Sequence, residues 1–126
     1  MSELFPVIAR VDSTYLGWED HGLFTCVVGF DYGDGGHQTN PAPCLDTPLK
    51  DENGKFFRRT GTAEGMDFIM RVMEACSVRE WDNLIGRTVF VLKDKDGWGS
   101  MIVGIRPLPV DKGKEFVFAD AFKDAS

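Results

Sequence analysis

The chain has 126 residues, a net charge of −6 at pH 7 and a pI near 4.8. This length, with 43% hydrophobic residues, predicts a single domain over residues 1–126 built around one hydrophobic core. The acidity disfavours nucleic acid as a partner, since proteins that track a phosphate backbone carry a basic stripe and the one tight basic pair here is Arg58–Arg59.

Two strands are predicted in the first quarter of the chain. Residues 5–11 are rich in apolar and β-branched side chains, and residues 23–32 alternate strictly between apolar and other side chains. The alternation places on one face Phe24, Cys26, Val28, Phe30 and Tyr32. We expect the two strands to pair through a turn at residues 19–22. Residues 31–53 are rich in Gly and Pro and are predicted to be mostly loop.

The clearest helix is predicted at about residues 63–76, after a short third strand that begins at residues 56–57. Thr62 is a good N-cap, and Glu64 places negative charge in the first turn, where the helix dipole favours it. Two apolar strips run along this helix, which predicts packing against a sheet. The strips consist of Met66, Ile69, Met70 and Met73, and of Phe68, Val72 and Ala75.

A short second helix is predicted at about residues 78–85. Residues 77–80 have the pattern of a capping box, in which a Ser is followed three positions later by a Glu. We expect Trp81 and Leu84 to face inward and Gly86 to end the helix.

The last third of the chain is predicted to be β structure. Strands are expected at residues 87–93, 100–105 and 115–119, and residues 94–97 have hairpin chemistry between the first two. The order of elements predicts an α+β fold, with a mainly antiparallel sheet of five to six strands and one central helix. A curled, barrel-like sheet with the helix across one end and a flat sheet with one covered face both fit this pattern.

One candidate anion site precedes the predicted helix. Its residues are Arg58, Arg59, Thr60, Gly61 and Thr62. Two guanidinium groups would lie near the free N–H groups of a helix start, which favour anions. The structural alternative is an edge strand with outward Arg side chains, a Gly turn and an N-cap. Neither nucleotide-binding fingerprint is present in the sequence.

Metal and catalytic chemistry find little support in the motifs. The acidic loops at residues 31–38 and 94–97 lack the order of an EF-hand, and the two His and three Cys lack the close pairing of a zinc site. The odd number of Cys at wide spacing indicates a reducing compartment rather than a disulfide framework. No nucleophile elbow is present. We predict no metal and no cofactor, and the sequence favours a binding protein over an enzyme.

Aromatic residues in predicted loops are the best candidates for a binding surface. Trp18, Tyr32 and Trp98 lie beside Gly and charged residues, and Tyr and Trp are common anchors of protein interfaces. Asp34 and His37 in the Gly-rich loop complete the predicted surface. The structural alternative is that each Trp covers the core from its edge.

The arrangement of turns, caps and core positions resembles a family of small uncharacterised proteins encoded by bacteriophages and prophages. The resemblance covers roughly residues 18–92 and is carried by Trp18-Glu-Asp-His-Gly22, Asp31-Tyr-Gly33, Gly61-Thr-Ala-Glu-Gly-Met-Asp-Phe-Ile-Met70 and Gly86-Arg87. The chain departs from the family at Thr39-Asn-Pro-Ala-Pro-Cys44, where the family has a further Gly and aromatic stretch. The resemblance implies a phage accessory protein in a bacterial cytoplasm. Small acidic proteins of this kind often bind and block host factors, including defence complexes.

The leading functional hypothesis is a non-enzymatic protein that binds a host or phage protein through an acidic, aromatic-bearing surface. A second hypothesis is a single-stranded nucleic-acid accessory protein, built on a barrel-like sheet with Phe90 and Trp98. A third is a small anionic-ligand binder or enzyme that uses Arg58 and Arg59. We expect no membrane span, because no apolar run approaches about 18 residues, and we expect a cytoplasmic location. The sequence leaves the oligomeric state open.

Overall fold

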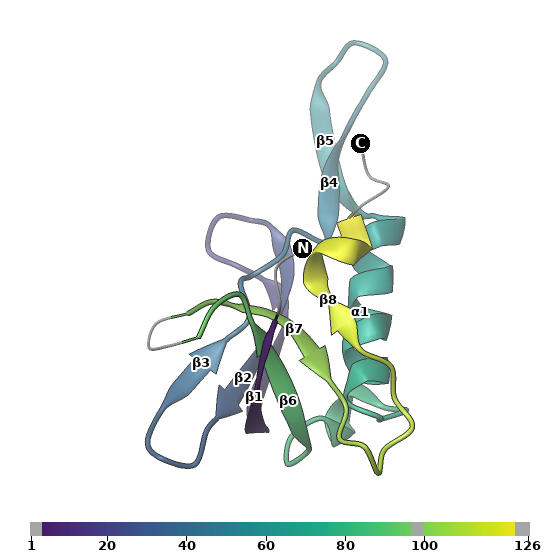
Figure 1. Cartoon of the computed structure of the whole chain (residues 1–126). Helices are drawn as coiled ribbons and strands as arrows, with labels where there is room; N and C mark the ends of the chain where they lie inside the picture. Colours follow the sequence, from purple (N-terminus) through teal and green to yellow (C-terminus); the bar gives the residue numbers. More distant parts are fainter. Residues whose placement is uncertain (1–3, 97–99, 123–126) are drawn as a thin grey trace.

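The computed structural model describes residues 4–96 and 100–122, which form eight strands, one α-helix and two 3-10 helices (Figure 1). The strands are β1 (Phe5–Trp18), β2 (Phe24–Asp31), β3 (His37–Thr39), β4 (Asp46–Lys50), β5 (Phe56–Gly61), β6 (Thr88–Lys93), β7 (Ile102–Arg106) and β8 (Phe116–Val117). The helices are α1 (Ala63–Ala75), η1 (Trp81–Asn83) and η2 (Phe118–Phe122). The predicted α+β fold with antiparallel strands is confirmed.

Six strands form one antiparallel sheet in the order β3-β2-β1-β6-β7-β8. The long central strand β1 joins its two halves, because residues 5–10 pair with β6 and residues 10–18 pair with β2. A bulge between Val11 and Ser13 interrupts the β1–β2 ladder, and bulges of this kind bend a strand. The sheet is not closed into a barrel. It curls far enough for the Gln38 side chain at the β3 edge to donate a hydrogen bond of 3.0 Å to the Ser100 carbonyl.

The hydrophobic core lies between the inner face of this sheet and α1. The predicted alternation of β2 is confirmed, since Cys26, Val28 and Phe30 are buried and the two flanking aromatic residues pack against the core. From α1, Phe68 is 1% exposed and packs edge-on against Phe116 with ring centroids 5.2 Å apart. The cluster therefore joins the sheet, the helix and the C-terminal segment into one core.

Helix α1 begins as predicted but buries only one of its two apolar strips. The Thr62 hydroxyl accepts a hydrogen bond of 2.9 Å from the Gly65 amide, which is the expected N-cap. The strip with Phe68 faces the core, whereas Met66 and Met70 are 59% and 60% exposed. Gly65 explains why this strip is the buried one, because a Cβ at position 65 would lie 2.7 Å from the Leu45 Cα. Only the face with Gly65 can approach that backbone.

Residues 31–53 are mostly loop, as predicted, but they also hold two short strands that the sequence did not predict. β3 pairs with the end of β2, and β4 pairs with β5. Between them Asn40 takes the place of a strand partner. Its side-chain oxygen accepts a hydrogen bond of 2.6 Å from the Val28 amide, and its amide nitrogen donates to the carbonyl oxygens of Cys26 and Pro41.

The predicted second helix is reduced to the single 3-10 turn η1. Ser77 does not cap a helix, because its φ is 60° and its hydroxyl accepts a hydrogen bond of 3.0 Å from the amide of Gly113. Leu84 is buried and Trp81 is half-buried, as expected. Gly86 ends the segment with a φ of 96°, a conformation that favours glycine.

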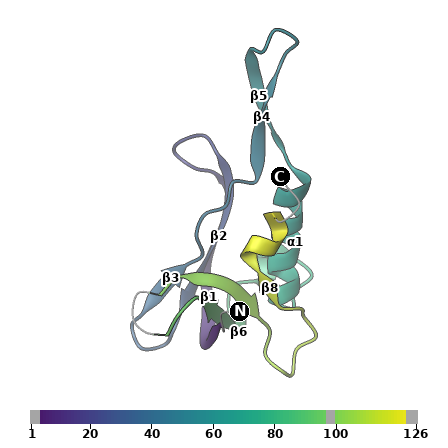
Figure 2. The same cartoon turned by 45° about the horizontal axis from the view of Figure 1, so that its top comes forward.

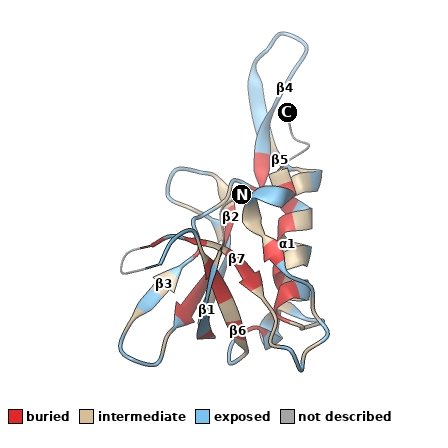
Figure 3. Cartoon of the chain, in the orientation of Figure 1, coloured by how far each residue is buried: buried red, intermediate tan, exposed pale blue. Residues whose placement is uncertain are grey.

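Strands β4 and β5 form a two-stranded ribbon that extends from the rest of the fold beyond the start of α1 (Figures 1 and 2). Almost all of it is exposed, with burial only near its base (Figure 3). Its tip is a defined turn, because the Asp51 carboxylate accepts hydrogen bonds of 2.9 Å from the amides of Asn53 and Lys55. Gly54 adopts a φ of 80° there. The ribbon is therefore an ordered arm with side chains open to solvent.

Candidate functional site

The end of the β1–β2 hairpin presents a group of aromatic side chains. Trp18 is 55% exposed and packs edge-on against Phe24, with ring centroids 5.0 Å apart. The Tyr15 hydroxyl donates a hydrogen bond to the Trp18 carbonyl, and Tyr15 is 48% exposed. These contacts fix the Trp18 backbone and one edge of its ring while the remainder of the ring faces solvent.

The turn beside this group is acidic. Backbone hydrogen bonds from the Glu19 amide to the Leu23 carbonyl and from the Gly22 amide to the Glu19 carbonyl confirm the turn predicted at residues 19–22. Asp20 and His21 are exposed at its tip. We call the end of this hairpin, with Leu16 and Trp18 on one face of β1, Tyr15 on the other face, and Glu19 and Asp20 in the turn, the hairpin surface. It combines aromatic and apolar area with two carboxylates, the chemistry that the sequence predicted for a protein-binding face.

Tyr32 is held against the sheet rather than presented by a loop. Its hydroxyl donates a hydrogen bond of 2.6 Å to the Gln38 side-chain oxygen, and the Lys93 ammonium lies 4.6 Å from its ring centroid. Burial raises the pKa of the Tyr32 hydroxyl to about 12. Tyr32 therefore serves chiefly to fasten β3 and β6 to the end of β2.

Asp34 lies in the exposed segment between β2 and β3, and His37 is the exposed first residue of β3. The Asp34 carboxylate accepts a hydrogen bond of 2.9 Å from the Gly36 amide and so shapes the loop. His37 Nε2 lies 3.0 Å from Asp12 Oδ1, and the Ser13 hydroxyl donates to that same oxygen at 3.1 Å.

This cluster does not have the arrangement of a nucleophilic triad. A catalytic Ser needs the His next to its hydroxyl, with the acid behind the His, whereas here both side chains contact Asp12. Gly29 lies beneath the cluster, since a Cβ there would be 2.9 Å from His37 Nε2. The absence of that Cβ makes room for the three polar side chains. The cluster ties β1 to β3 across the sheet.

The predicted binding residues do not form one surface. Trp18 pairs with Phe24 at one end of the β1–β2 ladder, and Arg10 pairs with Asp31 at the other. The segment that carries Tyr32, Asp34 and His37, from the end of β2 to the start of β3, is therefore roughly 23 Å from the hairpin surface along the strands. Trp98 lies outside the described residues.

The predicted anion site has its principal charge neutralised. Arg59 donates hydrogen bonds to Asp46 of 2.7 Å from Nε to Oδ2 and 3.2 Å from Nη2 to Oδ1. The Arg59 guanidinium holds the pKa of the Asp46 carboxyl below its usual range, and Asp46 raises the pKa of Arg59 in return. The pair joins the two strands at the base of the ribbon, while Arg58 is exposed on the ribbon.

The helix start in this region is occupied by the chain itself. Thr60 and Gly61 end β5, and Thr62 uses its hydroxyl both to accept from Gly65 and to donate to the Leu45 carbonyl. The Leu45 backbone packs directly on Gly65. This geometry is that of a tightly packed N-cap and does not favour an anion-binding site there.

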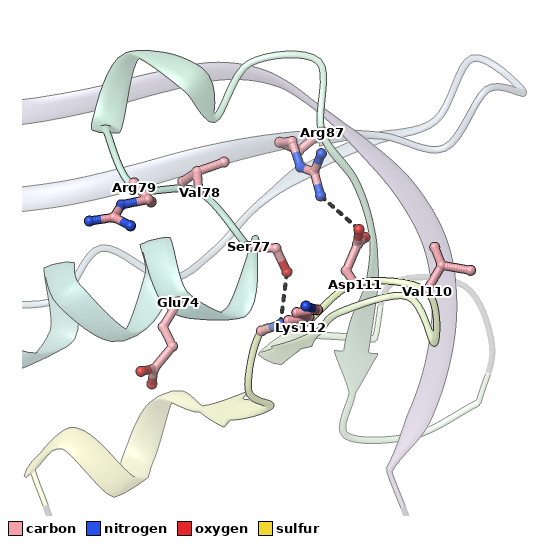
Figure 4. Close-up of a pocket in the computed structure, with 9 residues that line it drawn as sticks. Glu74, Ser77, Val78, Arg79, Arg87, Val110, Asp111 and Lys112 are labelled. Carbon is pink, nitrogen blue, oxygen red and sulfur yellow. Dashed lines mark hydrogen bonds and ion pairs between the residues drawn. The ribbon is translucent and has the colours of Figure 1, made fainter.

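Depressions in the surface are open and have mixed polar and apolar linings. One of about 470 Å³ lies between the end of α1, residues 77–79 and the segment after β7 (Figure 4). Arg87 on its wall is held by an ion pair of 3.2 Å to Asp111 and by a hydrogen bond to the Cys76 carbonyl. Among residues 4–96 and 100–122, no group of three or more His, Cys, Asp or Glu side chains is placed to hold a metal ion.

A comparison of the chain with protein families, curated proteins and solved structures finds no match. Within the described residues, no helix is long and apolar enough to cross a membrane.

The hairpin surface was predicted in part, through Trp18. Tyr15 and Leu16 were missed because they lie beyond the predicted first strand. The signal available for them was the apolar–aromatic pair directly before the turn.

Proposed function

We propose that the chain is a non-enzymatic phage accessory protein that binds a host or phage protein in the bacterial cytoplasm. The target class proposed is a host defence complex, on the basis of the resemblance to small phage-encoded proteins. The observation that carries the proposal is the hairpin surface, where Trp18 is half-exposed yet anchored by Phe24 and Tyr15.

An anchored aromatic side chain is well suited to dominate a protein interface. Trp and Tyr are enriched among the residues that contribute most to binding. Because Trp18 is already packed on one edge, it loses less side-chain freedom on binding than a mobile ring would. The neighbouring Glu19 and Asp20 add negative charge. The partner proposed is a protein with an apolar pocket bordered by Lys or Arg side chains.

A pull-down from bacterial lysate tests this proposal. The tagged full-length chain is compared with Trp18→Ala at about 150 mM salt, where the Debye length is about 8 Å, and retained proteins are identified by mass spectrometry. We expect a specific protein that is retained by the wild type and lost with Trp18→Ala. Removal of an interface Trp typically lowers affinity by about tenfold or more.

The matched control is Ile85→Ala, since Ile85 is 57% exposed and lies far along the chain, after η1. This variant should retain the same protein as the wild type. Equal retention by all three chains, or no retained protein, would count against the hairpin surface as a binding site.

A second candidate function is binding of single-stranded nucleic acid. The order β3-β2-β1-β6-β7, with the helix between β3 and β6, is shared with OB-type barrels, which bind oligonucleotides near the first hairpin. The exposed ring of Trp18 could stack on a base. The acidity of the turn opposes this function, and for that reason it stands second.

Fluorescence titration separates the two candidates. Stacking on oligonucleotides would quench Trp fluorescence at low salt, and the quenching would weaken steeply as salt rises. Absence of quenching at low salt would remove this candidate and leave the protein-binding proposal intact.

A further inference from the structure

The β4–β5 ribbon and the outer face of α1 have matching chemistry and similar length. The register places Leu49 opposite Arg58 and Lys50 opposite Phe56, so apolar and cationic side chains alternate across the ribbon. Phe56 and Phe57 are 54% and 59% exposed. The ribbon carries four cations against three carboxylates, which are Lys50, Lys55, Arg58 and Arg59, and Asp46, Asp51 and Glu52.

The outer face of α1 has the opposite character. Met66 and Met70 lie one turn apart and are more than half exposed. The helix around them carries three carboxylates against one cation, which are Glu64, Asp67 and Glu74, and Arg71. Exposed Met side chains are adaptable apolar contacts. An acidic face with an apolar centre thus stands beside a basic ribbon with an apolar surface.

The geometry of one copy prevents these two surfaces from meeting within it. The ribbon extends away from the N-terminal end of α1, roughly along the direction of the helix (Figures 1 and 2). The helix of 13 residues is about 20 Å long, and the five residues of β4 span about 17 Å. Rotation of a second copy by 180° about an axis near Thr62 would lay each ribbon along the helix of the other.

We propose that the chain forms a two-fold symmetric dimer in which the β4–β5 ribbon of each copy packs on the outer face of α1 of the other. Because the contact is made twice, each half is small. A stable interface of about 1,200 Å² in total needs about 600 Å² from each copy, less than a tenth of the 8170 Å² surface of one chain.

Pairing of ribbon edges is a poorer alternative for association. Pro48 in β4 lacks an amide donor, Lys50 brings charge to the same strand, and a bulge interrupts β5 opposite Leu49 and Lys50. Proline, lysine and bulges are the features that keep sheet edges from pairing with other chains. The ribbon therefore contacts its partner through side chains on its faces.

Sedimentation equilibrium of the full-length chain tests the dimer directly. We expect the mass to rise from 14.1 kDa toward twice that value as the concentration rises from micromolar to millimolar. Phe57→Ser and Met66→Ser should each weaken dimerisation by about tenfold or more. Ile8→Ser is the control, because Ile8 is 54% exposed on β1 and should leave dimerisation unchanged.

Cross-linking tests the geometry of the dimer. In a Cys44→Ser background, Asn53→Cys at the ribbon tip and Glu74→Cys at the end of α1 should form disulfides between copies. Within one copy these positions lie roughly 35 Å apart, so an intramolecular disulfide is excluded. The pair Asn53→Cys and Asp20→Cys should not cross-link, since Asp20 lies in the β1–β2 turn.

Two outcomes would overturn the dimer. They are a monomer at every concentration and equal cross-linking of the control pair. Both are independent of Trp18, so they leave the proposed protein-binding function to its own test.

Discussion

The guanidinium of Arg59 and the carboxylate of Asp46 fasten the base of the β4–β5 ribbon through two hydrogen bonds. The Asp46 side chain is 2% exposed and that of Arg59 is 21% exposed. The same carboxylate accepts from the Phe24 amide at 3.1 Å, so it links the ribbon to the start of β2. One buried acid thus fixes an exposed arm relative to the main sheet.

Asp46→Ala should destabilise the fold by about 2 kcal/mol, because it removes charged hydrogen bonds and leaves the Phe24 amide without its acceptor. Urea unfolding provides the measurement. The control is Asp67→Ala, which removes a more exposed ion pair to Arg71 on α1 and should cost less than about 0.5 kcal/mol. Similar losses for the two variants would contradict the structural role of Asp46.

The Asp46–Arg59 pair should also make stability depend on acid pH. The pair lowers the pKa of Asp46 below the value of 3.8 for an unperturbed carboxyl. A group with a lowered folded-state pKa contributes stability above its unfolded pKa, and this contribution is lost as the pH falls through the folded pKa. The unfolding free energy of the wild type should therefore fall more steeply than that of Asp46→Ala between about pH 5 and about pH 2. If the unfolding free energies of the two proteins change with pH in parallel, the Asp46 carboxyl does not contribute to the pH dependence of stability.

Gly65→Ala should destabilise the protein by about 2 kcal/mol, although Ala is the better helix former. The new methyl group would collide with the Leu45 backbone, which cannot move without shifting the ribbon base. Gly61→Ala is the matched control, since no atom lies within 4 Å of the position of its Cβ. Thermal or urea unfolding of both variants would show whether the clash with the Leu45 backbone outweighs the better helix propensity of Ala at position 65. A stabilised Gly65→Ala would contradict the packing described.

Thiol reagents should distinguish the three cysteines. Cys26 and Cys76 are buried, and burial raises the pKa of each thiol to about 12, so few thiolates form at neutral pH. Cys44 is exposed. One thiol should react quickly in the native protein, and the other two only on unfolding. A native Cys44→Ser variant that still reacts quickly would contradict the burial of the remaining two.

The parts of the fold predicted from the sequence are those whose side chains alternate between a core and solvent. β2 and the start of α1 were predicted because their signals are local: strict alternation in one and a Thr N-cap in the other. The ribbon was not predicted as a pair of strands. Its strands are exposed on both faces and β4 contains Pro48, so no apolar alternation marks them.

Other differences depend on contacts between distant residues. Ser77 had the sequence of a helix cap, but its hydroxyl meets Gly113, which lies 36 positions away. The sequence did not indicate which of the two apolar strips of α1 is buried. That depends on the close approach of Gly65 to the Leu45 backbone. For the hairpin surface, the sequence indicated Trp18 as a binding candidate but did not settle its exposure, and it did not predict the anchoring of Trp18 by Tyr15 and Phe24.

The central position of β1 has a consequence for synthesis on the ribosome. Val7 pairs with Val91, so the first half of β1 must wait for a partner made 84 residues later. At about 5–20 residues per second this delay is on the order of ten seconds. During that time Val7 and Ala9 leave the exit tunnel without a neighbouring strand, and the nascent chain is open to chaperones or to aggregation. Full assembly of the sheet comes only after β6 has emerged.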